Sequence, residues 1–366
     1  MPSGRVTPCD LCDPSPRSRP VLDNLGSNGH SPAMMARVDP LVRLLLLAIV
    51  LASVLPVTAE WRPVAQGVSN GAVFLLFLLN GLRLPRADVV RGIGHVRFLA
   101  PLVLWCFGAM ALAGWGLSLA LGGWLPPLVA LGFLYLGTLP STVQSATAYT
   151  SLAGGNVANS VVAAAMLNIL GVFLTAPLFS ALAGSEAAPF DLAALQKVAL
   201  ILLLPFVLGQ LAQGRFGHIV REHRMAATWM DRTAIAIAVY VAFSGAVEEG
   251  LWGRVDLAEW AALLAGVAAL LAFAFAGAWL LAGWLGLGRG ERIAFLFSGG
   301  QKSIAMGAPL AAVLFPSGTA GLVLLPVLVY HLLQLVLSAP IASRLAGDRA
   351  RPSGDCDGPT TTAKSR

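Results

Sequence analysis

Long apolar runs separated by short polar segments dominate the chain. A helix of about 17 to 25 apolar residues is long enough to cross the hydrocarbon layer of a bilayer. The pattern therefore predicts an all-α polytopic membrane protein with ten transmembrane helices. The expected spans lie near residues 38–57, 64–84, 98–121, 125–152, 157–182, 196–213, 231–249, 257–287, 292–315 and 319–343.

The two ends of the chain lack this apolar pattern. Residues 1–33 are rich in Pro, Ser, Gly and Asn, so we expect a disordered tail over 1–37, with Met34 or Met35 as an alternative start of translation. The polar residues 344–366 are expected to form a disordered cytoplasmic tail. The first span also has features of a signal peptide, but its removal would break the symmetry described below.

Composition and charge agree with a membrane location. The chain is 57% hydrophobic and 11% charged, whereas soluble domains carry about 25% charged residues. Its net charge of +6 does not favour a nucleic-acid partner, because the basic residues flank the spans. If both termini are cytoplasmic, the outer loops hold only Arg62, Lys197 and Arg254 among the basic residues. The positive-inside rule then predicts a multi-pass protein of the plasma (inner) membrane with both termini in the cytoplasm.

A short polar pattern occurs twice. Residues 141–145 (STVQS) and 298–302 (SGGQK) lie 157 residues apart, in the fourth and ninth spans. An odd number of spans separates them, so the second half would enter the membrane from the opposite side, as in the inverted repeats of secondary transporters. This predicts a first repeat over 38–182 and an inverted second repeat over 196–343. The alternative is a chance similarity between two polar stretches.

Both polar patterns lie beside residues that disrupt helices. Gly137 to Pro140 lie just before the pattern at 141–145. The pattern at 298–302 contains Gly299 and Gly300, and Gly307 to Pro309 follow it. Backbone groups freed in hydrocarbon cost several kcal/mol each, so such breaks persist only where protein or a water-filled cavity satisfies them. Helices four and nine are therefore expected to be broken around a binding site at the midplane. The alternative is a pair of ordinary kinks.

The breaks concentrate side chains that can bind an ion or a polar solute. Neutral hydroxyl and amide oxygens suit a hard cation that sheds its water, and their N–H and O–H groups can donate to an oxyanion. The candidate substrate-binding or ion-binding residues are Gln144, Ser145, Thr147, Thr150, Asn156, Ser160, Ser298, Gln301, Lys302 and Ser303.

Lys302 is the one cation among these candidates. It lies about ten residues into its span, hence roughly 15 Å deep in a hydrocarbon layer of about 30 Å. A charge at this depth is costly and usually marks a pathway, an ion pair or a ligand counter-ion. Two alternatives remain open: the ammonium contacts backbone carbonyls at the ends of broken helices, or it contacts an anionic substrate.

One face of the last span is also polar. Tyr330, His331, Gln334 and Ser338 recur at helical spacing, and we expect them to face the interior of the bundle. A packed, hydrogen-bonded role for His331 is favoured over proton transfer.

Motifs for other functions are absent from the spans. The sequence has no GxxxxGK[ST] segment for ATP and no HExxH motif, and its adjacent carboxylates Glu248 and Glu249 lie at the outer end of the seventh span rather than in its interior, so we expect neither an ATPase nor an enzyme. Ser303 beside Lys302 is a weak imitation of a catalytic Ser-Lys pair. The four cysteines, Cys9, Cys12, Cys106 and Cys356, form no disulfide framework, and we expect no cofactor.

Three stretches carry a resemblance to a known family. FLLFLLNGLRLPR (74–86), LPSTVQSATAYTSLAGGNVANSVVAAAMLNILGVFLTAPL (139–178) and FSGGQKSIAMGAPLAAVLF (297–315) resemble the SBF-like branch of the bile acid:sodium symporter superfamily. The resemblance implies two inverted five-helix repeats, in which the fourth and ninth helices break and cross. It also implies a panel domain of spans one, two, six and seven, and a core domain of spans three to five and eight to ten.

The sodium ligands of that superfamily are matched here only in part. By this resemblance, a sodium site would use Thr150, Asn156, Ser160 and Gln301. The acidic residue that sodium-coupled members place just before the glutamine is absent, because Gly300 precedes Gln301. We therefore hypothesise that the Lys302 ammonium occupies or abuts the space of a bound cation. Sodium or protons remain the candidate coupling ions. A Lys302 that titrates would couple transport to protons, whereas a permanently charged Lys302 would suit an anion uniporter or exchanger.

The function expected from these observations is secondary active transport of a small organic anion by alternating access. The alternative is a non-transporting membrane regulator or sensor of ion homeostasis, because eukaryotic relatives of the branch are associated with calcium regulation. The expected partners are the anion and the lipid bilayer. The sequence does not determine the oligomeric state.

Overall fold

The computed structural model describes residues 40–83, 95–187, 196, 199–248, 250 and 256–347. Within these ranges all regular structure is helical. The tail to residue 37, its Cys9 and Cys12, and residues 348–366 lie outside the described residues. The helices are α1 (Pro40–Val54), α2 (Arg62–Arg83), α4 (Val96–Leu104), α5 (Met110–Leu121), α6 (Pro127–Thr138), α7 (Gln144–Leu152), α8 (Val157–Ala187), α10 (Leu204–Glu222), α11 (Arg224–Glu248), α12 (Leu257–Trp284), α13 (Arg289–Gly300), α14 (Ile304–Leu314) and α15 (Ser317–Gly347), with π-helical turns at Trp105–Ala109 and Ala199–Leu203.

Seven helical stretches in the described part of the chain are long and apolar enough to cross a membrane: Arg62–Arg83, Val96–Leu121, Val157–Gly184, Ala199–Glu222, Arg224–Glu248, Leu257–Trp284 and Gly318–Gly347. Two shorter apolar helices, α1 and α6, accompany them. Large side chains on these helices remain exposed, including Leu211, Leu280 and Val336. Such apolar surface along long helices fits contact with lipid. The chain is therefore a multi-pass membrane protein, helical throughout the regular structure of its described residues.

The two predicted helix breaks are present. The helix α6 ends at Thr138, α7 begins at Gln144, and Leu139 between them has extended backbone angles. In the second half, α13 ends at Gly300, α14 begins at Ile304, and Gln301 is extended. The prediction of broken segments in the fourth and ninth apolar runs is confirmed.

The disruption expected at Gly307 to Pro309 was wrong, because these residues lie inside α14. A proline in a helix removes one backbone hydrogen bond. The helix tolerates this loss because α14 is packed among α11, α15 and α2, and Gly307 to Leu310 are buried.

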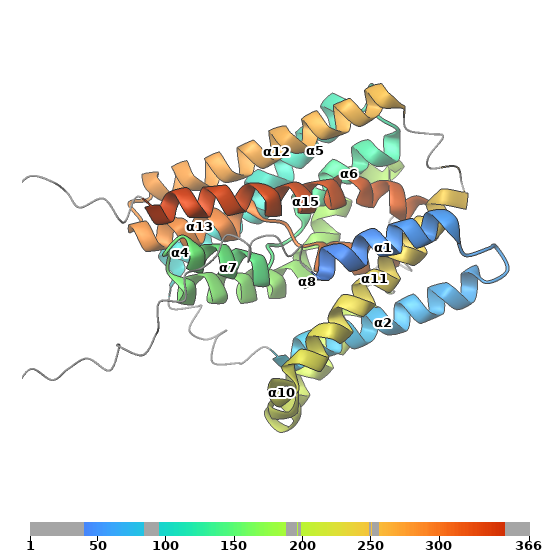
Figure 1. Ribbon diagram of the computed structural model, residues 1–366, viewed down its shortest axis with the longest axis horizontal. Helices are drawn as coiled ribbons and strands as arrows, with labels where there is room; N and C mark the ends of the chain where they lie inside the picture. The colour runs from blue at the N-terminus through green and yellow to red at the C-terminus, as the bar shows by residue number, and fades with distance from the viewer. Residues whose placement is uncertain are drawn as a thin grey trace, which may run out of the picture. The chain divides into compact units, whose positions relative to one another are not determined.

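One group of packed helices contains α1, α2, α10 and α11 (Figure 1). Here α2 and α10 approach closely at two glycines: a Cβ on Gly81 would lie 2.3 Å from the Phe206 carbonyl oxygen, and one on Gly209 would lie 2.3 Å from that of Leu78. Small residues permit such backbone contact between membrane helices. Hydrogen-bonded ion pairs join α2 to α11 at opposite ends, Arg62 to Glu248 and Arg83 to Asp231, so these two helices are antiparallel.

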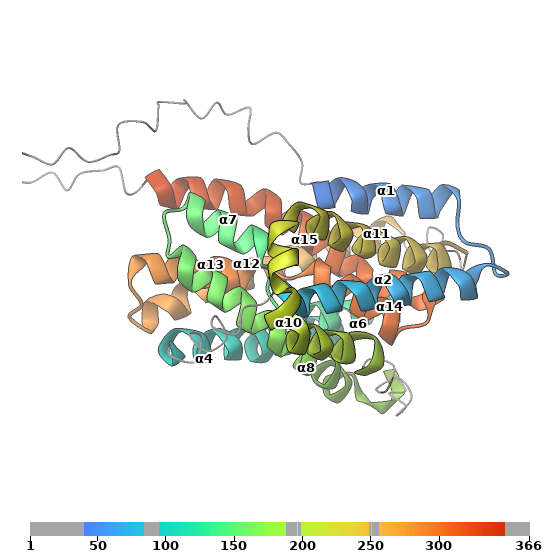
Figure 2. The ribbon, with the colours of Figure 1, turned by 90° about the horizontal axis from the view of Figure 1, so that it is seen from below.

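The remaining helices pack around the two breaks. Helix α6 contacts α5, α8 and α15, and α13 contacts α7 and α12; Figure 2 shows α7 beside α13. At the α5 and α6 contact, a Cβ on Gly114 would lie 2.4 Å from the Phe133 carbonyl oxygen. Edge-to-face contacts among Tyr135, Phe179 and Phe315 fill the space near α14. The breaks are therefore held inside a packed helical core.

Candidate functional site

A backbone hydrogen bond joins the two helix breaks. The Ser303 N–H donates to the Pro140 carbonyl oxygen at 2.9 Å. The non-helical segments 139–143 and 301–303 therefore lie against each other, and this bond satisfies one polar backbone group in each. Unwound backbone is stable at membrane depth only in such a protein-lined setting.

Gln301 connects both breaks to α15. Its side-chain oxygen accepts hydrogen bonds from the Thr142 and Ser145 hydroxyls, both at 2.7 Å. Its amide nitrogen donates to the Ser338 hydroxyl at 2.9 Å. The Thr142 and Ser145 oxygens are also 2.7 Å apart. Gln301 is completely buried, so its contacts form a polar cluster enclosed by apolar helices.

Lys302 is 1% exposed and lies beside this cluster. Its Nζ donates to three backbone carbonyl oxygens: Leu139 at 2.7 Å, Gly137 at 2.9 Å and Cys106 at 3.1 Å. Its own backbone is held by Gln334, whose Oε1 accepts from the Lys302 N–H at 2.7 Å and whose Nε2 donates to the Lys302 carbonyl at 3.0 Å. The sequence left two alternatives for the ammonium, backbone carbonyls or an anionic substrate. In this structure it contacts backbone carbonyls.

These carbonyls are available for a physical reason. The last carbonyls of a helix have no N–H partner within that helix, and Gly137 and Leu139 lie at the end of α6. Cys106 belongs to the π-helical turn, where the Met110 N–H bonds five residues back to Trp105. A π turn lengthens the hydrogen-bonded ring and interrupts the α-helical pattern. Local backbone irregularities therefore place acceptors around the ammonium.

A second polar cluster lies between α7 and α8. The Thr150 and Thr147 hydroxyl oxygens are 3.3 and 3.5 Å from that of Ser160. Thr150 and Ser160 are buried and Thr147 is half-buried. Three hydroxyl oxygens converge here, which is a donor set that can serve a monovalent cation.

The start of α8 orders the neighbouring asparagines. The Asn156 side-chain oxygen accepts from the Asn159 N–H at 3.0 Å, as an N-terminal cap does. The Asn159 amide donates to the Glu291 carboxylate at 3.2 Å. The Asn156 N–H donates to the Gly290 carbonyl at 2.8 Å, so this end of α8 is joined to the start of α13.

The predicted site residues therefore fall into separate groups. Ser145 and Gln301 share the first cluster with Lys302 beside it, whereas Thr147, Thr150 and Ser160 form the second. The Ser303 hydroxyl caps α14 by accepting from the Met306 N–H at 3.2 Å. Ser298 is buried, and its hydroxyl has no hydrogen-bond partner among the described residues. Gln144 is exposed at the first residue of α7.

Four further residues of the site were not predicted as binding residues from the sequence: Gln334, Ser338, Glu291 and Cys106. Thr142 belongs to the polar pattern at 141–145 that the sequence did single out. A signal existed for Gln334 and Ser338, because they follow Tyr330 at helical spacing on the polar face of the last span. That face is buried as predicted, and the Tyr330 hydroxyl donates to the Gly300 carbonyl at 2.7 Å. Cys106 had no signal, because its contribution is a backbone carbonyl, and Glu291 had none, because only the packing of α8 on α13 brings it to Asn159.

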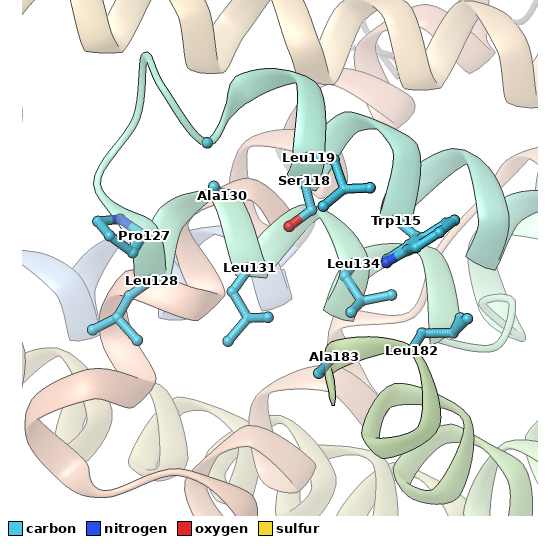
Figure 3. A pocket seen from close by; sticks show the side chains of 11 residues that line it. Trp115, Ser118, Leu119, Pro127, Leu128, Ala130, Leu131, Leu134, Leu182 and Ala183 are labelled. Carbon is cyan, nitrogen blue, oxygen red and sulfur yellow. The ribbon is translucent and has the colours of Figure 1, made fainter. Parts of the chain in front are cut away.

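A cavity elsewhere has a different character. A groove of about 410 Å³ is lined by α5, α6 and the end of α8, with leucine, proline and alanine side chains (Figure 3). Trp115 and Ser118 supply its polar side-chain atoms. None of the candidate polar residues lines this groove. The junction of the breaks is therefore the better candidate site.

Two interrupted helices that meet through buried polar groups inside a membrane bundle are typical of secondary transporters. The comparison with family models gives the same class: residues 39–347 match the SBF-like CPA transporter family. The chain therefore belongs to that family, and the resemblance found in the sequence is confirmed.

The similarity to individual proteins is consistent with this assignment. The chain is 35% identical to the "Putative symporter YfeH" of Escherichia coli K12 over 84% of its own length and 92% of the relative's. It is 38% identical to the protein PA2026 of Pseudomonas aeruginosa PAO1, over 83% of the chain and 92% of the relative. It is 22% identical to sodium/bile acid cotransporter 7 of Rattus norvegicus, over 74% of the chain and 81% of the relative. A transport function is therefore supported.

Proposed function

We propose that this protein is a secondary active transporter that carries a small organic anion across the plasma (inner) membrane by alternating access. The observation that carries the proposal is the contact between the two helix breaks, through Ser303 and Pro140 and through Gln301 with Thr142 and Ser145. When one group of helices moves against the other, a site built from two broken helices can change the side of the membrane to which it is open.

Contacts between segments support a ten-span topology with two inverted repeats. The ion pair of Arg62 with Glu248 joins two predicted outer ends, and that of Arg83 with Asp231 joins two predicted inner ends. Arg289 donates to the Leu345 carbonyl, which joins an inner loop to the predicted cytoplasmic end of the last span. Each contact connects positions that ten spans would place on the same side of the membrane.

The packing also supports a panel domain and a core domain. Helices α1, α2, α10 and α11 correspond to predicted spans one, two, six and seven, and they pack together. Helix α11 also packs against α14 and α15, which would be the contact between the domains. We propose that the core, with both breaks, rocks against this panel during transport.

An anionic substrate is proposed from the charge and the donors at the junction. Lys302 brings a positive charge to the two breaks, and α7 begins beside them. Val143 supplies no side-chain cap to α7, and the Thr142 hydroxyl accepts from the Ala146 N–H at 3.3 Å. Backbone N–H groups and the helix dipole favour an anion at such a terminus. Gln144 and Ser145 lie at this terminus and are not fully buried. We propose that the substrate's charged group binds there.

The coupling ion is proposed to be sodium or a proton. The hydroxyl cluster of Thr147, Thr150 and Ser160 is the proposed sodium site, with Asn156 at the start of α8. For proton coupling, Glu291 is the proposed carrier, because its carboxylate contacts Asn159 beside that cluster. Gln301 contributes to the other cluster, so a single sodium site that includes all four residues would require rearrangement.

Thermal unfolding of the purified protein tests binding. The melting temperature is measured against a panel of organic anions, with sodium or choline as the cation, between about pH 5 and 9, because a ligand that binds only the folded state raises stability. A stabilising anion is then tested for accumulation in proteoliposomes. Accumulation driven by a sodium or proton gradient supports the proposal. Binding without any flux would contradict it and favour a sensor.

A further inference from the structure

We propose that the Lys302 ammonium is a permanently attached cation that occupies a cage of backbone carbonyls and fastens the two helix breaks together. The cage would otherwise be suited to a free monovalent cation. This inference rests on the proposed function only for its consequence in transport, namely that no free cation is needed at this position.

The cage has the ligands that proteins use for weakly hydrated monovalent cations. Rings of backbone carbonyl oxygens replace the hydration shell of an ion in selective channels. Around Lys302, all three described acceptors of the ammonium are backbone carbonyls, at 2.7 to 3.1 Å. The ammonium has three N–H groups, so each can be used. At 1% exposure, the side chain leaves little access for water.

The charge of Lys302 is balanced by dipoles. The described ion pairs are those of Arg62 with Glu248 and Arg83 with Asp231, and Lys302 belongs to neither. Two of its acceptors lie at the C-terminal end of α6, where the helix dipole presents its negative end. This end of α6 would be repelled by an anion and stabilised by a cation. The local field therefore favours a positive charge at this point.

The ammonium and the oxygens of the cage come from three separate segments of the chain. The Gly137 and Leu139 carbonyls belong to the first break, Cys106 belongs to the π-helical turn, and Lys302 itself lies in the second break. Gln334 of α15 holds the Lys302 backbone through both its N–H and its carbonyl. The ammonium therefore connects this anchored residue of the second break to the carbonyls of the first. Removal of the ammonium should leave the carbonyls unsatisfied and loosen the junction.

Cation rescue tests this inference directly. Lys302→Ala removes the ammonium and leaves space for a small ion, whereas Lys302→Met keeps most of the volume without charge. Melting temperatures of purified wild type and both variants are compared in ammonium, methylammonium, potassium, sodium and choline chlorides at equal ionic strength. Choline is the control because its quaternary ammonium has no N–H to donate.

The expected result is a melting temperature lowered by roughly 5 °C or more in both variants in choline. Ammonium or methylammonium should raise the melting temperature of Lys302→Ala in a saturable manner. The melting temperatures of wild type and Lys302→Met should stay at the values measured in choline. Unchanged stability of both variants in choline would overturn the proposal. So would the absence of rescue of Lys302→Ala by every cation tested.

If Lys302→Ala folds poorly, a second measurement still tests the carbonyl cage. Membranes that contain it are solubilised in methylammonium or in choline, and the monodisperse fraction is measured by size exclusion. Recovery in methylammonium alone supports the cage, and equal loss in both salts overturns it. These readouts need no substrate, so failure of the cage is distinguishable from failure of anion transport, which is measured on wild-type protein.

Discussion

The Ser303 N–H donates a hydrogen bond of 2.9 Å to the Pro140 carbonyl oxygen, across the point where two interrupted helices meet. Proline cannot donate a backbone hydrogen bond, but its carbonyl still accepts one. The residue that breaks the first helix thus supplies an acceptor to the second. Each break stabilises the other, which makes the junction a single structural unit.

Gln301→Ala should abolish or strongly reduce transport. The variant removes an amide that bonds Thr142, Ser145 and Ser338, and it leaves buried hydroxyls with fewer partners. An unsatisfied buried polar group costs about 1–3 kcal/mol. Uptake in proteoliposomes and the melting temperature are measured together.

Gln210→Ala is the matched control, because Gln210 donates to the Gly81 carbonyl between α2 and α10, away from the breaks. This variant should lose stability without a comparable loss of uptake per folded molecule. If the two variants lose uptake equally, the junction has no special role in transport.

Gly81→Ala should destabilise the protein severely. Its Cβ would lie 2.3 Å from the Phe206 carbonyl oxygen and 3.0 Å from the Gly209 Cα. Backbone atoms cannot move aside as a flexible side chain can, so α2 and α10 must separate. Gly67→Ala is the control, since nothing lies within 4 Å of the position of its Cβ. A melting temperature for Gly81→Ala equal to that for Gly67→Ala would refute this close approach.

Arg83 and Asp231 should show energetic coupling. Their side chains are hydrogen-bonded and only 27% and 16% exposed, and a charged hydrogen bond contributes about 1.5–3 kcal/mol. Asp231→Asn and Arg83→Gln should each destabilise the protein, and the double variant should lose less than the sum of the two. Additive losses in melting temperature would show that the pair does not couple α2 to α11.

The sequence predicted the features that depend on residue type along one segment. Pro140 and the Gly299-Gly300 pair indicated where two helices end, and the spacing of Tyr330, Gln334 and Ser338 indicated a buried polar face. Lys302 was recognised as a cation inside an apolar run. These inferences need only local chemistry and helical periodicity.

Other features depend on contacts between distant segments. The Cys106 carbonyl reaches Lys302 because of a π turn that no proline marks, and periodicity does not predict an extra residue in a turn. Glu291 lies at the start of its helix in the sequence, and only the packing of α8 on α13 brings it to Asn159. Gly307 to Pro309 indicated a break that packing suppresses.

Two-sided access to Ser145 tests the central claim most directly. In a chain without its other cysteines, Ser145→Cys in sealed vesicles is exposed to a membrane-impermeant thiol reagent from one side or the other. Trp61→Cys and Met225→Cys are the controls, because these residues are 64% and 73% exposed at opposite predicted faces. Alternating access predicts that each control reacts from one side, opposite to the other, while Ser145→Cys reacts from both. Reaction of Ser145→Cys from a single side under all gradients and substrates would contradict it.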